Sequence, residues 1–301
     1  MIWRVKHLTL RQLRVFESAS RHLSFTRAAE EMHLTQPAVS MQVRQLEEHV
    51  GLPLFEQIGR KLLLTDAGAE IQRLARGMSR LMTDAETAID EIKGLKRGHL
   101  KITVAGTANY FVPQLLAEFT KAYPGITISL DVTNREGLLR QLDENDTDIA
   151  IMGRPPNDRD YDFTPFRDNP LVIIARPDHP LARKKRIPLE RLADETFLVR
   201  EPGSGTRIAM ERFFHERNMR VRTGMEVGSN EAIKQSVQAG LGLGLLSQDT
   251  VGLELKLKHL VLLDVEGFPI MRHWYAVTMK NRQPSKATQA FREFLLHTSK
   301  N

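Results

Sequence analysis

The stretch that decides the fold of this chain is Ser24–Gly51, which has the sequence SFTRAAEEMHLTQPAVSMQVRQLEEHVG. Ser24 is a favourable N-cap, and apolar residues then recur at helical spacing, so we expect a helix over Phe25–Met32. Thr35 is a second N-cap, and Gly51 is a typical stop for the helix that follows it. Two helices joined by so few residues must cross at a steep angle, which is the geometry of a helix-turn-helix.

The connection between these helices is His33-Leu34 and lacks the glycine found in many such turns. Histidine is enriched at positive φ among non-glycine residues, so it is tolerable here. The small side chains of Ala28 and Ala29 allow a close crossing. We expect the two helices to share a core of Met32, Leu34, Val39, Val43 and Leu46.

A further helix over Leu10–Ser20 is expected before this motif, and a hairpin with a glycine turn, 54–64, after it. Arg60 and Lys61 lie near the tip of the hairpin, where cations could lie over phosphates or a minor groove. A solvated surface hairpin and a helical hairpin for protein contacts are the alternative interpretations. The order of the features favours a winged helix-turn-helix whose second helix enters a major groove.

The region 66–98 carries an apolar stripe with a strict heptad repeat. Its spacing alternates between three and four residues, which predicts a long helix that forms a coiled coil: Ile71, Leu74, Met78, Leu81, Ala85, Ala88, Ile92 and Leu95. Thr65 can cap this helix. An amphipathic helix packed inside its own chain is the alternative. The narrow stripe favours pairing with a second copy, because paired helix-turn-helix domains bind two half-sites.

From His99 onward, β-like runs alternate with helical stretches, which indicates an α/β domain with largely parallel sheets. The expected strands are His99–Ala105, Ile126–Val132, Ile149–Met152, Leu171–Ala175, Phe197–Arg200, Leu243–Leu246, Leu260–Val265 and Trp274–Met279.

The composition restricts the function. The 301 residues predict two or three domains, and the net charge of +6 is compatible with a polyanionic partner. The absence of cysteine excludes disulfides and thiolate chemistry, and no apolar run is long enough for a signal peptide or a membrane span, so we expect a cytoplasmic protein.

Common catalytic motifs such as GxSxG, HExxH and the P-loop are absent. We therefore expect no catalytic residue, metal or cofactor. An enzyme and a free solute-binding protein are the remote alternatives.

Residues Leu10–Gly68 strongly resemble the DNA-binding region of the LysR-type transcriptional regulators, and the resemblance extends over the whole chain to an effector domain like a periplasmic solute-binding protein. It implies domains at 1–65, 66–98 and 99–301, the last with lobe I at 99–168 and 273–301 and lobe II at 169–272. The stretch AAEEMHLTQPAVSMQVRQLEE also resembles the corresponding sequence of the subgroup that activates RuBisCO and Calvin-cycle operons. A regulator of another metabolic operon is the alternative.

The resemblance implies a homodimer or a dimer-of-dimers tetramer on promoter DNA, with RNA polymerase as a further partner and no membrane. Two positions depart from the family pattern: Met41 and Gln57 stand where arginine is common. We expect DNA contacts from Thr26, Arg27, Thr35, Gln36, Pro37, Ser40, Met41, Gln42, Arg44 and Arg60.

Three loop-to-helix junctions, 106–110, 201–207 and 228–231, are candidate walls of an effector cleft. Free backbone N–H groups at helix starts bind anions, and an arginine could add a bidentate pair, which suits a phosphorylated or carboxylated metabolite. Ordinary helix caps and surface ion pairs are the alternatives. The subgroup resemblance implies effectors such as ribulose bisphosphate, phosphoenolpyruvate or NADPH. The candidate effector residues are Thr107, Ala108, Asn109, Gly153, Arg154, Glu201, Ser204, Thr206, Arg207, Asn230, Glu231 and Gln248.

Overall fold

The computed structural model describes residues 8–59, 61–92 and 98–298, except for the side chains of residues 83, 84, 86–88 and 90–92. The chain forms two compact units, Met1–Leu95 and Lys96–Asn301, and each is described by itself.

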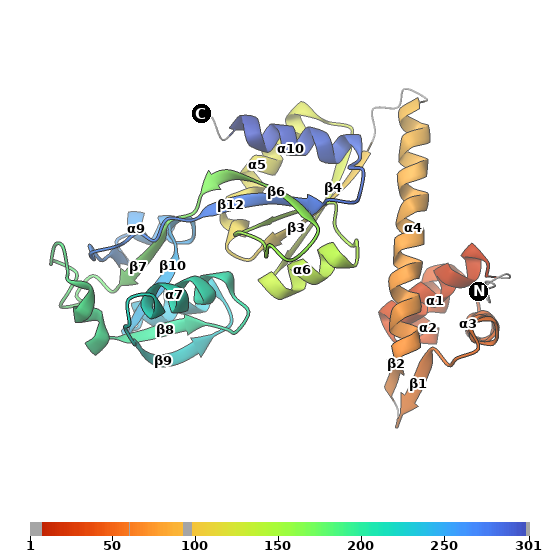
Figure 1. The fold of residues 1–301 in the computed structure, drawn as a ribbon, viewed down its shortest axis with the longest axis horizontal. Helices are drawn as coiled ribbons and strands as arrows, with labels where there is room; N and C mark the ends of the chain where they lie inside the picture. Colours follow the sequence, from red (N-terminus) through yellow and green to blue (C-terminus); the bar gives the residue numbers. More distant parts are fainter. Residues whose placement is uncertain (1–7, 60, 93–97, 299–301) are drawn as a thin grey trace. The chain divides into compact units, whose positions relative to one another are not determined.

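The N-terminal unit is a winged helix-turn-helix, as predicted (Figure 1). Its elements are α1 (Leu10–His22), α2 (Phe25–Met32), α3 (Gln36–Val50) and the antiparallel hairpin of β1 (Phe55–Ile58) and β2 (Lys61–Leu64). Ser24 caps α2 by accepting a hydrogen bond from the Arg27 amide, and His33 ends it in the left-handed region at φ 54°. Thr35 occupies the N-cap position of α3, as predicted, but its side chain makes no capping hydrogen bond.

Aromatic packing fixes the wing against the helices. The ring centroid of Phe55, in β1, lies 5.4 Å from that of Phe16 in α1 and 5.2 Å from that of Phe25 in α2. Phe16 is completely buried, as are Ala28 and Leu46. The hairpin is therefore anchored on the same core that holds the helix-turn-helix together.

An ionic cluster ties α2 to the end of α1. The Glu31 carboxylate lies 2.6 Å from Arg21 and 2.6 Å from His22, and it accepts a hydrogen bond of 3.1 Å from Ser18. The bonds from Arg21, His22 and Ser18 lower the pKa of Glu31 to about 2 from an ordinary value of 4.5. Because the carboxylate is favoured in the folded state, the stabilisation is present above pH 4.5 and is lost as the pH falls toward 2.

Glu31→Gln should therefore destabilise the protein at pH 7 and have little further effect near pH 2. The Glu31 side chain is 41% exposed, so solvent screening limits the expected loss to about 1 kcal/mol. Denaturant unfolding of the two proteins at pH 7, 4 and 2.5 measures the difference. Glu48→Gln is the control, because the Glu48 side chain is 66% exposed and, among the described residues, pairs only with Arg44, at 3.6 Å. A difference between wild type and Glu31→Gln that does not shrink at low pH contradicts the ionic role of Glu31.

The long helix α4 (Asp66–Ile92) follows the hairpin, as the heptad predicts. Thr65 caps it by accepting a hydrogen bond of 3.0 Å from the Gly68 amide. The side of α4 that faces α1 buries Ala75. Four described residues of the heptad stripe are exposed: Leu74, Met78 and Leu81, by 46%, 41% and 69% respectively, and Ala85. Ala88 and Ile92 have no described side chains, and Leu95 lies outside the described residues.

The C-terminal unit has two α/β lobes, which confirms the predicted fold class. The sheet of lobe I has the order β4-β3-β5-β12-β6. Helices α5 and α10 cover one face of it and α6 the other (Figure 1). Its elements are β3 (Gly98–Ala105), η1 (Ala108–Tyr110), α5 (Val112–Ala122), β4 (Ile126–Thr133), α6 (Arg135–Asp143), β5 (Ile149–Met152), β6 (Tyr161–Asp168), β12 (His273–Met279) and α10 (Lys286–Thr298).

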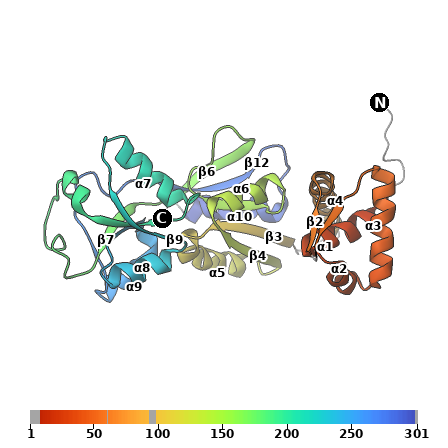
Figure 2. The same ribbon diagram turned by 90° about the horizontal axis from the view of Figure 1, so that it is seen from below.

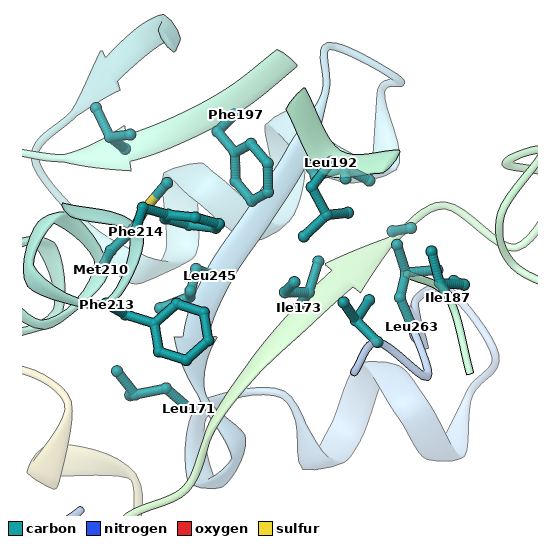
Figure 3. Packing of buried hydrophobic residues seen from close by; sticks show 14 of the residues in the cluster. Leu171, Ile173, Ile187, Leu192, Phe197, Met210, Phe213, Phe214, Leu245 and Leu263 are labelled. Carbon is teal, nitrogen blue, oxygen red and sulfur yellow. The ribbon is translucent and has the colours of Figure 1, made fainter. Parts of the chain in front are cut away.

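Lobe II has a second sheet, of order β11-β7-β10-β8-β9. Helix α7 packs on one face through Met210, Phe213 and Phe214, while α8 packs on the other (Figures 2 and 3). The elements are β7 (Leu171–Ala175), η2 (Leu189–Asp194), β8 (Thr196–Arg200), α7 (Gly205–His215), β9 (Arg222–Val227), α8 (Asn230–Gln238), β10 (Leu243–Ser247), η3 (Gln248–Thr250), α9 (Gly252–Lys256) and β11 (Val261–Leu262).

Both sheets are mixed rather than largely parallel. β3 runs parallel to β4 and β5, but β12 is antiparallel to both of its neighbours, and β7 is antiparallel to β10 and β11. The antiparallel pairs involve β7 and β12, which lie next to the segments where the chain crosses between the lobes. Parallel neighbours need a crossover connection, usually a helix, and β6, β7 and β12 are connected through the crossings instead. The predicted strand at Leu260–Val265 shrinks to two residues, and β6 was missed.

The chain passes between the lobes twice, and the two crossings lie side by side. The outward crossing joins β6 to β7, and the return leads into β12. The Asn169 amide donates to the Arg272 carbonyl at 2.8 Å, and Leu171 and Ile270 exchange two backbone hydrogen bonds of 2.9 and 3.0 Å. The crossings therefore form a short two-stranded connection at the floor of the space between the lobes.

Candidate DNA-binding surface and effector cleft

The outer surface of α3 presents most of the predicted DNA-contacting residues. Gln36, Met41 and Arg44 are exposed, as are Thr35 and Pro37 at its start, while Ser40 and Gln42 are half-buried. Met41 is 54% exposed, which is unusual for a large apolar side chain and leaves it free to contact a base or sugar. Thr26 and Arg27 are exposed at the start of α2. Arg60 lies outside the described residues.

A cleft lies between the two lobes of the C-terminal unit. Its empty space, counted together with the open solvent at its mouth, is about 460 Å³. Lobe I contributes the ends of β3, β4 and β5, and lobe II contributes the end of β8 and the start of α7. The lining residues are Ala105, Gly106, Thr107, Asn134, Arg135, Met152, Gly153, Asn169, Arg200, Glu201, Ser204, Gly205, Thr206, Arg272 and Trp274.

Arg272 extends from the return crossing into this cleft. Its Nη1 donates a 3.0 Å hydrogen bond to the Gly205 carbonyl in lobe II. A Cβ at Gly153 would lie 2.3 Å from its Nη2, so a side chain at this position would displace the guanidinium from where it lies. Burial, and then the charges of Arg135 and Arg212, lower the pKa of Arg272 to about 10. Among the described residues, no carboxylate pairs with this guanidinium.

Arg135 supplies a second cation at the first turn of α6. Its Nη1 donates to the Arg154 carbonyl at 2.9 Å, and burial lowers its pKa. Arg135 likewise pairs with no carboxylate among the described residues. The one glutamate in the lining, Glu201, is held by Arg200 through two hydrogen bonds of 2.7 and 2.8 Å. The cleft therefore has an uncompensated positive charge, which favours an anionic ligand.

The start of α7 strengthens this preference. Gly205 and Thr206 line the cleft, and Ser204 precedes the helix without making a side-chain cap. The first N–H groups of an uncapped helix and its dipole attract negative charge. An anion in the cleft would face two guanidinium groups and this helix end together.

The structure brings together five of the predicted effector residues, which line the cleft: Thr107, Gly153, Glu201, Ser204 and Thr206. The other seven do not line it. Ala108 is buried, and Asn109 and the side chain of Arg154 are exposed.

The remaining four of the seven have other neighbours. Arg207 is held by Glu211 and Glu226, at 2.8 and 2.6 Å. Asn230 contacts Arg200, Glu231 accepts a 2.7 Å bond from Tyr110, and Gln248 lines a separate hollow beside Arg167.

Sequence analysis missed Asn134, Arg135, Asn169, Arg200, Arg272 and Trp274. Asn134 and Arg135 follow the predicted strand that ends at Val132, and Asn134 caps α6. They form a strand-to-helix junction, which is the pattern that predicts the other candidate residues, so the same pattern could have predicted Asn134 and Arg135. Arg272 and Asn169 lie on the crossings, and no local pattern marks a crossing residue as part of a cleft.

A helix-turn-helix with an exposed recognition helix, joined to a two-lobed domain with a positively charged cleft, defines a ligand-responsive transcription regulator rather than an enzyme. The family model for the bacterial regulatory helix-turn-helix protein, lysR family, matches residues 10–69, and that for the LysR substrate binding domain matches residues 93–300. The chain belongs to the LysR family.

Its relatives include RuBisCO operon regulators. It is 53% identical over 290 residues, 96% of each chain, to the RuBisCO operon transcriptional regulator of Allochromatium vinosum. It is 45% identical over 291 residues to the HTH-type transcriptional activator CmpR of Synechocystis, covering 97% of this chain and 96% of the relative.

Two solved structures are informative. The regulatory domain of Synechocystis CcmR in complex with 2-PG is 46% identical, with a TM-score of 0.66 over 68% of this chain and 99% of that one. Full-length CbnR with its target DNA has a TM-score of 0.73 over 97% of this chain and 100% of that one, at 20% identity, and shows the fold alone. Within the described residues, no helix is long and apolar enough to cross a membrane, and no three His, Asp or Glu gather as a metal site.

Proposed function

We propose that this protein regulates transcription of a carbon-fixation operon, as an activator of RuBisCO genes, in response to a small phosphorylated acid. The observation that carries the proposal is the near-full-length identity to the Allochromatium vinosum RuBisCO operon regulator. The exposed α3 supports the DNA-binding part of this function, and the cationic cleft supports the binding of an acidic effector.

The DNA-binding form is proposed to be a homodimer, or a tetramer of two dimers, that acts on promoter DNA in the cytoplasm and contacts RNA polymerase. Leu74 and Leu81 on α4 are exposed. An adjacent hollow is lined by α1, α2, the turn after α2 and α4. Its lining is mixed, with the polar residues Arg11, Arg14 and Ser79 beside the apolar residues Leu10, Leu13, Met32, Leu34, Ala75, Met78 and Met82. A second copy of the chain would cover both surfaces and place two recognition helices for two half-sites.

The effector is proposed to be 2-phosphoglycolate or a similar small acid. The CcmR regulatory domain binds 2-PG, and Arg135, Arg272 and the start of α7 offer this chain the positive groups that a phosphate needs.

Binding between the lobes would favour one lobe arrangement over another. A difference of about 1–3 kcal/mol in effector affinity between arrangements is enough for a useful switch. The lobe arrangement would then change how the subunits hold the promoter.

The test compares binding of wild type and Ser40→Ala to a RuBisCO-operon promoter fragment and to random DNA. Ser40→Ala should reduce the preference for the promoter, because a base contact is lost while phosphate contacts remain. Wild-type affinity should fall by about 10³–10⁵ between 50 and 200 mM salt if six to ten phosphates are contacted. Ser129→Ala, on the exposed surface of β4, is the matched control. Equal wild-type affinity for both DNAs would overturn the proposal.

A further inference from the structure

Asn169 carries a buried side-chain amide that forms no hydrogen bond to any described residue. It is 2% exposed, and its Oδ1 has no partner among the described residues. The described contacts include no hydrogen bond from its Nδ2 either, although this residue lines the cleft. A buried amide without partners costs free energy, so its presence needs an explanation.

The backbone, rather than the amide, holds Asn169 in place. It lies on the outward crossing, and its N–H donates to the Arg272 carbonyl on the return crossing at 2.8 Å. The side chains of these two residues therefore enter the cleft from adjacent strands of the floor. The fold does not use the carboxamide, which leaves it available to a ligand.

We propose that Asn169 recognises the second acidic group of the effector, the carboxylate of a phosphorylated carboxylic acid. This inference rests on the proposed function and adds to it the residue that selects such an acid over phosphate alone. Arg135, Arg272 and the start of α7 hold the phosphate, and Asn169 Nδ2 donates to the carboxylate. The amide can turn to present Nδ2, because its nitrogen and oxygen are nearly equal in size.

Because Asn169 and Arg272 both lie on the crossings, the two connecting strands would themselves bind the effector. A ligand that joins Asn169 and Arg272 contacts both strands that connect the lobes. Occupancy of the cleft would then act directly on the segment about which the lobes move relative to each other.

The test is Asn169→Leu in the full chain, because leucine has a similar volume but no polar atom. Calorimetric titration should show 2-phosphoglycolate binding weakened by about 10-fold or more, the loss expected for a hydrogen bond to a charged group. Binding of inorganic phosphate should not change. The Tm of the unliganded protein should stay the same or rise, because a buried amide without partners has been removed.

Ser247→Ala is the matched control, because Ser247 Oγ is also buried without a partner but does not line the cleft. It should leave binding of both ligands unchanged. Asn169→Ala, which adds no bulk, should reproduce the selective loss of 2-phosphoglycolate affinity.

The outcomes separate this inference from the function on which it rests. If wild type binds 2-phosphoglycolate and both Asn169 variants bind it equally well, the inference is overturned and the proposed effector stands. If wild type binds neither ligand, the proposed effector fails. In that case a fall in Tm for Asn169→Leu also overturns the inference, since it would show that the amide serves the fold.

Discussion

Arg272→Met should lower the affinity of the protein for 2-phosphoglycolate by about 30- to 1,000-fold and abolish the response of promoter binding to this acid. The guanidinium lies in the cleft and pairs with no carboxylate of the described residues, so its charge is available to the ligand. Truncating one side of a buried charged pair costs about 2–4 kcal/mol, which gives this range of affinities. Methionine keeps most of the side-chain volume. Calorimetry on the full chain measures the loss.

Arg154→Met is the control for this experiment. The side chain of Arg154 is exposed, and only its carbonyl is used, by Arg135. Promoter binding without effector should be unchanged in both variants, because neither residue belongs to the N-terminal unit. An Arg272→Met protein with wild-type affinity for 2-phosphoglycolate would remove Arg272 from the effector site.

The double variant Leu74→Glu/Leu81→Glu should convert the proposed dimer to a monomer and weaken promoter binding by at least about 100-fold. The two leucines are 46% and 69% exposed and lie seven residues apart on α4. Charges on this stripe would be desolvated and face like charges of the second copy. A monomer carries one recognition helix, so it loses the gain of about 10²–10⁴ that linked binding of two half-sites provides.

Sedimentation measures the mass and a gel-shift titration measures the affinity. Ala69→Glu is the control, because Ala69 is exposed in the first turn of α4 and lies off the heptad stripe. It should remain dimeric. A double variant with wild-type mass and affinity would show that another surface holds the copies together.

The helix-turn-helix was predictable because short-range chemistry determines it. Ser24 caps α2, His33 takes a left-handed conformation and Gly51 ends α3 at φ 78°, all within one stretch. The apolar spacing alone decides which faces are buried. Thr35 was the exception, because its cap depends on a side-chain rotation that the sequence does not determine.

The strands with polar residues were harder to predict. β6, Tyr161–Asp168, contains Pro165 and charged residues and lies at the edge of its sheet, where one side needs no partner strand. β9, Arg222–Val227, is also an edge strand, with only Val227 buried, so its sequence resembles a loop. β5 and β7, which are fully buried, were predicted with correct bounds.

The cleft was predictable only in part, for a related reason. Thr107, Ser204 and Thr206 follow strands, and their loops are marked by glycine and helix caps. Asn169 and Arg272 are more than one hundred residues apart and meet only because lobe II is inserted into lobe I. Arg207, which sequence analysis favoured as an anion ligand, is instead engaged by two glutamates of its own lobe.

The paired crossings determine how a movement of lobe II can be transmitted along the chain. Lobe II is joined covalently to the rest of the chain only through those two adjacent strands, whereas the peptide that continues from α4 enters β3 of lobe I. Within one chain, the covalent path from lobe II to the N-terminal unit therefore runs first through the two crossing strands and then through lobe I, so a strain placed on either crossing strand lies on that path.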